Sequence, residues 1–421
     1  MKHKIKTLAN GLTVLMVNDK KCPSITVMVI VKAGGRNENS QNTGIAHLIE
    51  HNLFKGTKKF PSSKLLSYAV ENLGAYQNAY TGKEATSYYI KGPKQNAIPM
   101  IEILADMIKN PIFPQKEFEK EKKVVIEEIK MYEDHPSYKA YRLFLNNLFK
   151  ANQIGQDIAG TIDTVSKISV EQCKEFISNN YIANNTLVIV SGSFKQIEIL
   201  NVIKQNLKEL KKGTILSPEK FSPNKLNGRV EKYNKEIEQT HIVIGGFAPG
   251  SDVEYNEIIP FRLGITIMSG GMGSKLTQKI REELGLAYYI DMGYQTYSEI
   301  GQFNISLGVD HKRVNEAINE VLVELKALKD GDITDDEFAR AKNYILGMMS
   351  TSFETSSDIA SWYGSLLASN QKIISGEEVI EIINNIKKED VVNAWEPWLS
   401  KKNLIVVTYG KAKSKIVLKN I

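Results

Sequence analysis

The chain contains two diverged copies of one structural unit, and this duplication limits the folds that it can adopt. Residues 168–192 align without a gap on residues 386–410, and each stretch carries a glutamate, an asparagine and an apolar strand at matching positions. The helical stretch that begins at Glu117 likewise aligns with one that begins at Glu337. The sequence therefore predicts two domains of the same fold.

The predicted fold class is α+β. Strand-like and helix-like segments alternate in a way that favours, in each domain, a mainly antiparallel sheet with helices packed on one face. We expect the first domain over residues 1–212, a linker over 213–227 and the duplicated domain over 228–421. Pro218 and Pro223 interrupt helical periodicity in the linker. A chain of 421 residues with 42% apolar composition is long enough to give both domains a core.

The strongest chemical signal is the motif His-Leu-Ile-Glu-His at residues 47–51. On a helix, His51 stands about 40 degrees from His47, and Glu50 stands about 60 degrees away on the other side, so the three side chains share a face. A catalytic zinc site uses three protein ligands, and a nearby carboxylate activates the water in the fourth position. Thr43 is predicted to cap this helix. The alternative is two structural histidines beside a surface glutamate.

A third ligand is expected from the acidic helix over residues 117–134. Its apolar residues define a buried stripe, and Glu121 and Glu128 lie near the middle of that stripe, whereas Glu127 points away from it. A buried carboxylate is costly unless something compensates it. Glu128 as a zinc ligand and Glu121 as the partner of a ligating histidine account for both acids. The alternative is that both acids pair with buried lysine or arginine.

The second copy lacks this set of residues. In the aligned helix, Ala341 stands opposite Glu121 and Met348 stands opposite Glu128, and no pair of histidines has the spacing of the motif. The duplication therefore predicts one metal site for the two copies.

The motif at residues 47–51, followed by Glu128, resembles the inverted zinc motif of the pitrilysin, insulysin and mitochondrial processing peptidase family. Further blocks are similar to that family over nearly the whole chain. These blocks are Phe-Lys-Gly-Thr at 54–57, Asn-Ala-Tyr-Thr at 78–81, Val-Val-Ile-Glu-Glu-Ile at 124–129, Gly-Gly-Met-Gly-Ser at 270–274 and Gly-Leu-Ala-Tyr at 285–288.

The resemblance implies a zinc metalloendopeptidase, a hydrolase that cleaves peptides or unfolded segments in a closed chamber, with one Zn2+ per chain. His47, His51 and Glu128 would bind the metal. Glu50 would be the general base, and Glu121 would orient the site through a ligating histidine.

The resemblance also implies residues for substrate binding. Arg281 and Tyr288 would contact the substrate and stabilise the oxyanion, and Asn78 and Ala79 would lie on an edge strand that pairs with the peptide backbone. Without the resemblance, Arg281 would be read as a surface charge and Tyr288 as a core aromatic. No Gly-Lys-Ser/Thr follows the glycine-rich run at 269–274, which argues against a phosphate loop, and the resemblance implies a flexible lip on the substrate chamber instead.

Two other functions remain open at this point: a peptidase dedicated to processing one precursor, and a non-catalytic structural or partner subunit of the same fold. The resemblance also bears on assembly, because relatives that work as heterodimers tend to divide the zinc set and the Arg281–Tyr288 pair between two chains. This chain carries both, so we expect a homodimer, with a heterodimer of related chains as the alternative.

Composition limits the partners. The net charge is +6, with lysines dispersed along the chain, so no nucleic-acid partner is expected. The chain has no apolar stretch long enough for a bilayer, and the apolar run at residues 12–17 reads as a strand, so we expect neither a membrane segment nor a signal peptide. Cys22 and Cys173 are too few for a disulfide framework, which favours a cytoplasmic location.

Overall fold

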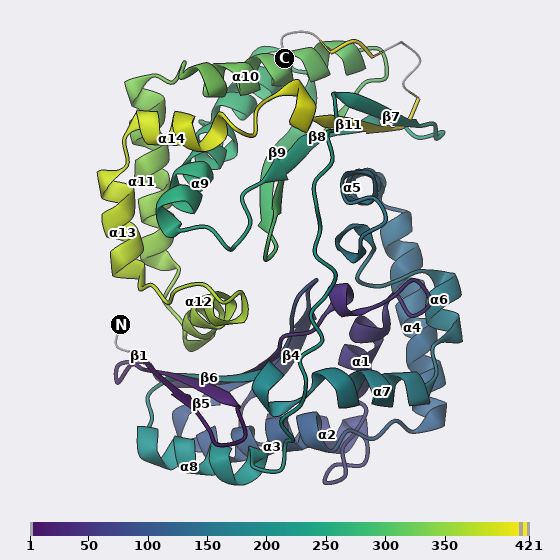
Figure 1. Cartoon of the computed structure of the whole chain (residues 1–421), viewed down its shortest axis with the longest axis vertical. Coiled ribbons are helices and arrows are strands. Elements are labelled where there is room, and N and C mark those ends of the chain that lie inside the picture. Colours follow the sequence, from purple (N-terminus) through teal and green to yellow (C-terminus); the bar gives the residue numbers. More distant parts are fainter. Residues whose placement is uncertain (1–2, 412–415, 419–421) are drawn as a thin grey trace. The chain divides into compact units, whose positions relative to one another are not determined.

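The computed structural model describes residues 3–411 and 416–418 (Figure 1). The chain forms two compact units, and each of them is assembled from separate stretches of sequence. The first unit contains residues 3–130, 156–219 and 352–374. The second contains residues 131–155 and 220–351 and the described residues from 375 onwards.

The first unit is built on a six-stranded sheet. The strands, in spatial order, are β1 (His3–Thr7), β2 (Thr13–Asn18), β6 (Thr186–Gly192), β3 (Ser24–Val31), β5 (Thr86–Pro93) and β4 (Tyr76–Thr81). β2 and β6 are parallel, and the other neighbours are antiparallel. β3 and β6 are buried along nearly their whole length, because their side chains are apolar on both faces of the sheet.

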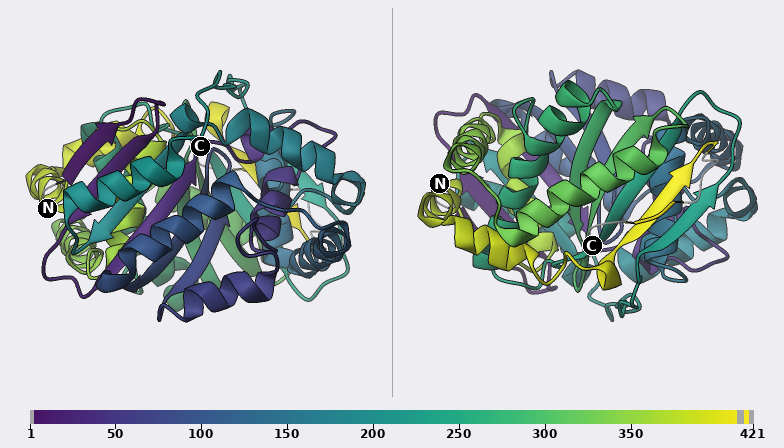
Figure 2. Two further views of the ribbon diagram at one scale, coloured as in Figure 1. Left: turned by 90° about the horizontal axis from the view of Figure 1, so that it is seen from below. Right: turned by 90° about the horizontal axis from the view of Figure 1, so that it is seen from above.

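Helices cover both faces of this sheet. On one face lie α1 (Ile45–Leu53), α2 (Ser63–Glu71), α3 (Ala97–Lys109), α4 (Gln115–Glu133), α6 (Ile162–Lys167), α7 (Val170–Asn180) and α8 (Gln196–Leu207). α3 and α8 lie side by side across the strands (Figure 2, left). On the opposite face lies α12 (Ser356–Ala368), which packs on β2, β3 and β6 (Figure 1).

The second unit has a five-stranded sheet. Its order is β7 (Arg229–Tyr233), β11 (Ile405–Tyr409), β8 (Thr240–Ala248), β10 (Gly301–Val309) and β9 (Ala287–Thr296). Figure 2 (right) shows β11 beside β7, its parallel neighbour. α5 (Pro136–Leu148) packs on β8 and β11. Figure 1 shows α5 and α10 (Val314–Asp330) on opposite faces of the sheet.

The remaining elements of the second unit are α9 (Tyr255–Ser269), the π-helical segment η5 (Thr277–Glu283), α11 (Asp335–Thr351), α13 (Gly376–Asn385) and α14 (Lys388–Trp395). Single turns of 3-10 helix occur at η1 (Gly35–Asn37), η2 (Lys94–Asn96), η3 (Gln153–Gly155), η4 (Ala183–Asn185) and η6 (Lys401–Asn403). Within the described part of the chain, no helix has both the length and the apolar character that crossing a bilayer requires.

The two sheets repeat one topology. The order β2-β6-β3-β5-β4 in the first unit has the same connectivity as β7-β11-β8-β10-β9 in the second, including the single parallel pair. The predicted duplication is therefore confirmed at the level of the sheets, and β1 is an addition at the edge of the first sheet.

Two helices are exchanged between the halves of the chain. α5 and α12 each follow the long helix of their own half, α4 or α11, yet each packs in the unit formed mainly by the other half. The predicted linker at residues 213–227 divides the chain into two consecutive halves. In the structure each compact unit also contains one helix from the other half, so neither unit is a single continuous stretch. Each exchanged helix covers an apolar sheet face that faces away from the other helices of its unit.

Replacing Ile359 by alanine tests the packing of α12. Ile359 is buried against the side chains of β2, β3 and β6, so we expect Ile359→Ala to lower the free energy of unfolding by about 2–4 kcal/mol in urea titrations. Ser361 is an exposed residue of the same helix, and Ser361→Ala should change it by less than about 0.5 kcal/mol. Equal effects of the two changes would contradict the packing of α12 on the sheet.

Candidate metal centre

The motif residues of α1 point away from the core because the other face of the helix is apolar and packs into the core. Ile45, Leu48, Ile49 and Leu53 are buried in the core, and this leaves the motif residues on the opposite side. His47, Glu50 and His51 are each partly exposed on that side. His47, Glu50 and His51 therefore share one face of α1, as the sequence predicts.

The start of α1 is capped by Glu38. One carboxylate oxygen of Glu38 accepts the Gly44 N–H at 3.0 Å, and the other accepts the Ala46 N–H at 2.9 Å. Burial raises the pKa of Glu38 to about 8, although these hydrogen bonds oppose the rise. The prediction that Thr43 caps the helix is wrong, because the Thr43 hydroxyl donates to the Asn39 carbonyl instead.

His47, His51 and Glu128 are brought together by the packing of α1 on α4. A carboxylate oxygen of Glu128 lies 3.9 Å from His47 Nε2 and 3.6 Å from His51 Nε2, and one ligand atom from each residue lies within 4.8 Å of the others. Ligand atoms about 2.1 Å from a tetrahedral zinc ion stand about 3.4 Å apart. The Glu128 oxygen therefore lies within about 0.5 Å of the separation that a shared zinc ion requires from either histidine nitrogen, and the three donors converge on one point.

The charge states suit a metal site. Burial, together with the neighbouring His51, lowers the pKa of His47 to about 4, so the imidazole of His47 is neutral at pH 7, as a metal ligand must be. The Nδ1 atom of His47 is buried and has no hydrogen-bond partner among the described residues. The two imidazole rings stand edge to face, 4.6 Å apart between centroids.

Glu121 lies behind His51, as the helical-face argument predicts. Its carboxylate is 3.4 Å from His51 Nδ1 and 2.7 Å from Lys55 Nζ. Burial acts to raise the pKa of Glu121, but the hydrogen bonds from His51 and Lys55 outweigh burial and lower it. Glu127, whose side chain is 72% exposed, points away and pairs with Lys130 at 2.8 Å. Sequence reasoning missed Lys55, because no periodic pattern marks a residue that lies two positions beyond the end of α1.

Glu50 is held by the end of β4. The hydroxyl and the backbone N–H of Thr81 both donate to the Glu50 carboxylate. Burial raises the pKa of Glu50, and the Thr81 hydrogen bonds oppose this effect. Thr81 was not predicted as a site residue, although it ends the Asn-Ala-Tyr-Thr block.

Asn78 and Ala79 lie in β4, the last strand of the sheet order. Among the described strands, β4 pairs with β5 alone. The Ala79 N–H donates to the side-chain oxygen of Asn78 at 2.8 Å. The predicted edge strand is therefore present, and its end adjoins Glu50 through Thr81.

Arg281 and Tyr288 lie next to each other in the second unit. The Arg281 guanidinium stands 5.1 Å from the centroid of the Tyr288 ring, and Tyr288 is 80% exposed. The alternative of a core aromatic is therefore wrong for Tyr288. Arg281 projects from the π-helical segment η5, a kind of helix that is frequent at functional sites.

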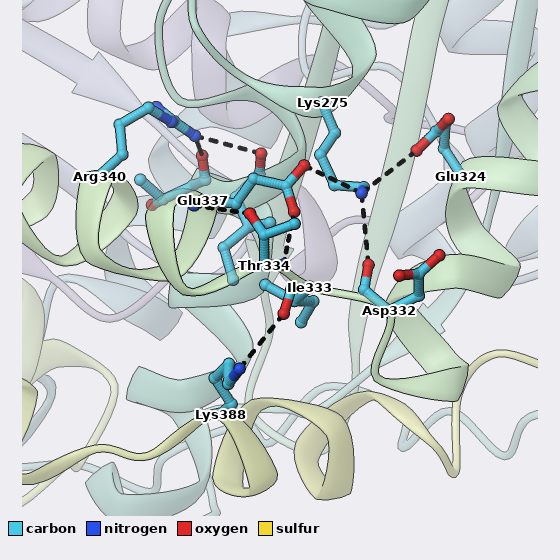
Figure 3. Close-up of polar contacts among 10 residues, drawn as sticks. Lys275, Glu324, Asp332, Ile333, Thr334, Glu337, Arg340 and Lys388 are labelled. Carbon is cyan, nitrogen blue, oxygen red and sulfur yellow. Dashed lines mark hydrogen bonds and ion pairs between the residues drawn. The ribbon is translucent and has the colours of Figure 1, made fainter.

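The glycine-rich segment before η5 is anchored at both ends (Figure 3). Arg340 of α11 donates to the carbonyl of Gly270 at 2.7 Å and to that of Thr266 at 3.1 Å, which satisfies acceptors at the end of α9. Lys275 bonds to Glu337 of the same helix at 3.0 Å and lies 3.8 Å from Glu324. The lip predicted at residues 269–274 thus has fixed ends.

Neutralising each of three acids of α4 should affect zinc affinity in a defined order. We expect Glu128→Gln to weaken binding by at least about 100-fold, because a direct ligand loses its charge, and Glu121→Gln to weaken it by about 10–100-fold. Glu127→Gln should have no effect, since Glu127 points away from the histidines. Competition with a chromophoric chelator measures the three affinities. Equal losses for Glu127→Gln and Glu128→Gln would contradict the assignment of ligands.

Comparisons with known proteins agree with this geometry. Residues 13–162 match the family model described as Insulinase (Peptidase family M16), and residues 167–345 match the one described as Peptidase M16 inactive domain. A protein of Rickettsia felis named as an uncharacterized zinc protease is 33% identical over 92% of this chain and 93% of its own length. The mitochondrial-processing peptidase subunit beta of Saccharomyces cerevisiae is 27% identical over 97% of this chain and 91% of its own.

A crystal structure of a protease from Helicobacter pylori has the same fold, with a TM-score of 0.90 at 23% identity over 97% of this chain and 99% of that one. The two family models match successive parts of the chain. The chain therefore belongs to the insulinase family of peptidases, family M16.

Proposed function

We propose that this protein is a zinc-dependent endopeptidase that hydrolyses peptides or unfolded segments within a closed chamber. The observation that carries the proposal is the convergence of His47, His51 and Glu128 beside Glu50, at the end of an edge strand. Relatives that are named zinc proteases support a peptidase role for the family.

The proposed chemistry follows from the side chains. Zinc bound by the two histidines and Glu128 would lower the pKa of water and polarise the peptide carbonyl. Glu50 would accept a proton from the attacking water and deliver it to the leaving amine. The raised pKa of Glu50 suits this role, because the carboxylate must both take up and release a proton near neutral pH.

The edge strand β4 would bind the substrate as an added strand. Backbone hydrogen bonds to an exposed edge recognise extended peptides with little regard to sequence. The Ala79 N–H is a donor that a peptide carbonyl could take over from the Asn78 side chain. Because Thr81 connects the end of β4 to Glu50, a peptide paired along the strand would reach the base. We assign Arg281 and Tyr288 to substrate contact and oxyanion stabilisation.

Glu50→Gln tests the catalytic role. The variant keeps all three metal ligands but loses the base, so we expect it to bind zinc as the wild type does and to lose cleavage of a mixed peptide library by at least about 100-fold. Glu127→Gln, a matched change of an exposed glutamate, should leave both properties unchanged. Zinc analysis and mass spectrometry of the library give the two readouts. Equal cleavage by Glu50→Gln and the wild type would refute the mechanism.

A dedicated processing peptidase is a second candidate, because a yeast relative is named as a subunit of the mitochondrial processing peptidase. The same library separates the two candidates, since a processing enzyme would cut few of its members. The complete set of His47, Glu50, His51 and Glu128 speaks against a non-catalytic subunit.

We also propose that the protein is a homodimer, because one chain carries both the zinc set and the Arg281–Tyr288 pair. Size-exclusion chromatography with light scattering should give about twice the chain mass of 47.3 kDa at concentrations where the protein is active. Full activity of a monomer would contradict this proposal. The cytoplasmic location stays a prediction.

A further inference from the structure

Lys55 and His51 contact different oxygens of the Glu121 carboxylate. Lys55 Nζ lies 2.7 Å from Oε1 of Glu121, and His51 Nδ1 lies 3.4 Å from Oε2. The Glu121 side chain is 9% exposed and the Lys55 side chain 26%. His51 lies in the last turn of α1 and Lys55 two residues beyond the end of that helix, whereas Glu121 comes from α4.

We propose that Lys55 is a positioning residue for the metal centre. It fixes the Glu121 carboxylate so that Oε2 faces His51 Nδ1, and the carboxylate in turn holds the His51 ring with Nε2 toward Glu128. The inference rests on the proposed zinc ligands and not on peptidase activity.

The need for Lys55 follows from the freedom of a glutamate side chain. The terminal torsion of glutamate is broad, so one long contact to His51 does not define the orientation of the carboxylate. The 2.7 Å ion pair to Oε1 supplies the second fixed point. Histidine ligands commonly donate their second ring N–H to a carboxylate, and loss of that partner weakens metal binding. Here the carboxylate that plays this part is itself oriented by a lysine.

An ordinary ion pair on α4 provides the matched control. Lys120 Nζ also lies 2.7 Å from a carboxylate, that of Glu117, but the side chains are 59% and 41% exposed and neither contacts the histidines. Such surface pairs have little effect on the rest of a protein. The length of the ion pair is thus the same in both cases, and the burial of the carboxylate and its contact with His51 are what differ.

The test measures zinc affinity by competition with a chromophoric chelator. We expect Lys55→Met to weaken zinc binding by about 5–10-fold, less than Glu121→Gln, which removes the direct partner of the ligand. Lys120→Met should leave the affinity unchanged. Lys55→Arg should restore most of the lost affinity, since a guanidinium also donates to a carboxylate.

A double-mutant cycle decides whether Lys55 acts through Glu121. In the Glu121→Gln background, Lys55→Met should change zinc affinity by less than about twofold, because the group on which it acts is already neutral. The same loss in both backgrounds, or no loss beyond that of Lys120→Met, would overturn the proposal. If Lys55→Met fails to fold by circular dichroism, Lys55→Gln takes its place in the cycle. Failure of the peptidase mechanism would appear in the Glu50→Gln cleavage assay and would leave this order of affinities intact.

Discussion

Burial of both faces of each sheet is the constraint on which the rest of the structure depends. β3 and β6 bury side chains on both faces, and the first half of the chain supplies helices for one face only. The other face is covered by α12, whose Ile359 and Tyr363 pack against Met28 and Ile189. α5 covers the corresponding face of the second sheet. Within the described residues, each sheet therefore has one face covered by a helix from the other half of the chain.

Periodic patterns were sufficient to predict most of the elements that position the site. α4 lies close to the range expected for the acidic helix, and α11 contains the helical stretch expected from Glu337 onwards. α9 was missed because it contains Pro260 and is buried on most sides, so it shows no polar face. The unbroken apolar run of β3 was a signal for a second layer of helices that the prediction of helices on one face did not use.

The helical-face argument predicted the site within α1 and α4, and it fails where partners come from separate elements. It separated Glu121 and Glu128 from Glu127 correctly, because the buried stripe of α4 is a local property of the sequence. The contacts of Thr81 with Glu50 and of Lys55 with Glu121 depend on how β4, α1 and α4 pack, which no local pattern encodes. The π-helical turn that carries Arg281 is likewise set by packing.

The second copy shows why Lys55, His51 and Glu121 depend on one another. At the aligned position of α11 the residue is Ala341, which is buried as Glu121 is, so this position belongs to the interior in both halves. A carboxylate there is costly unless cations and hydrogen-bond donors surround it. α9, the counterpart of α1 in the second copy, contains no histidine, and its basic residue Arg262 is exposed and lies over the Tyr294 ring. An acid in place of Ala341 would therefore lack the partners that Glu121 has, and the acid is tolerated only in the half where α1 and the turn after it supply both of them.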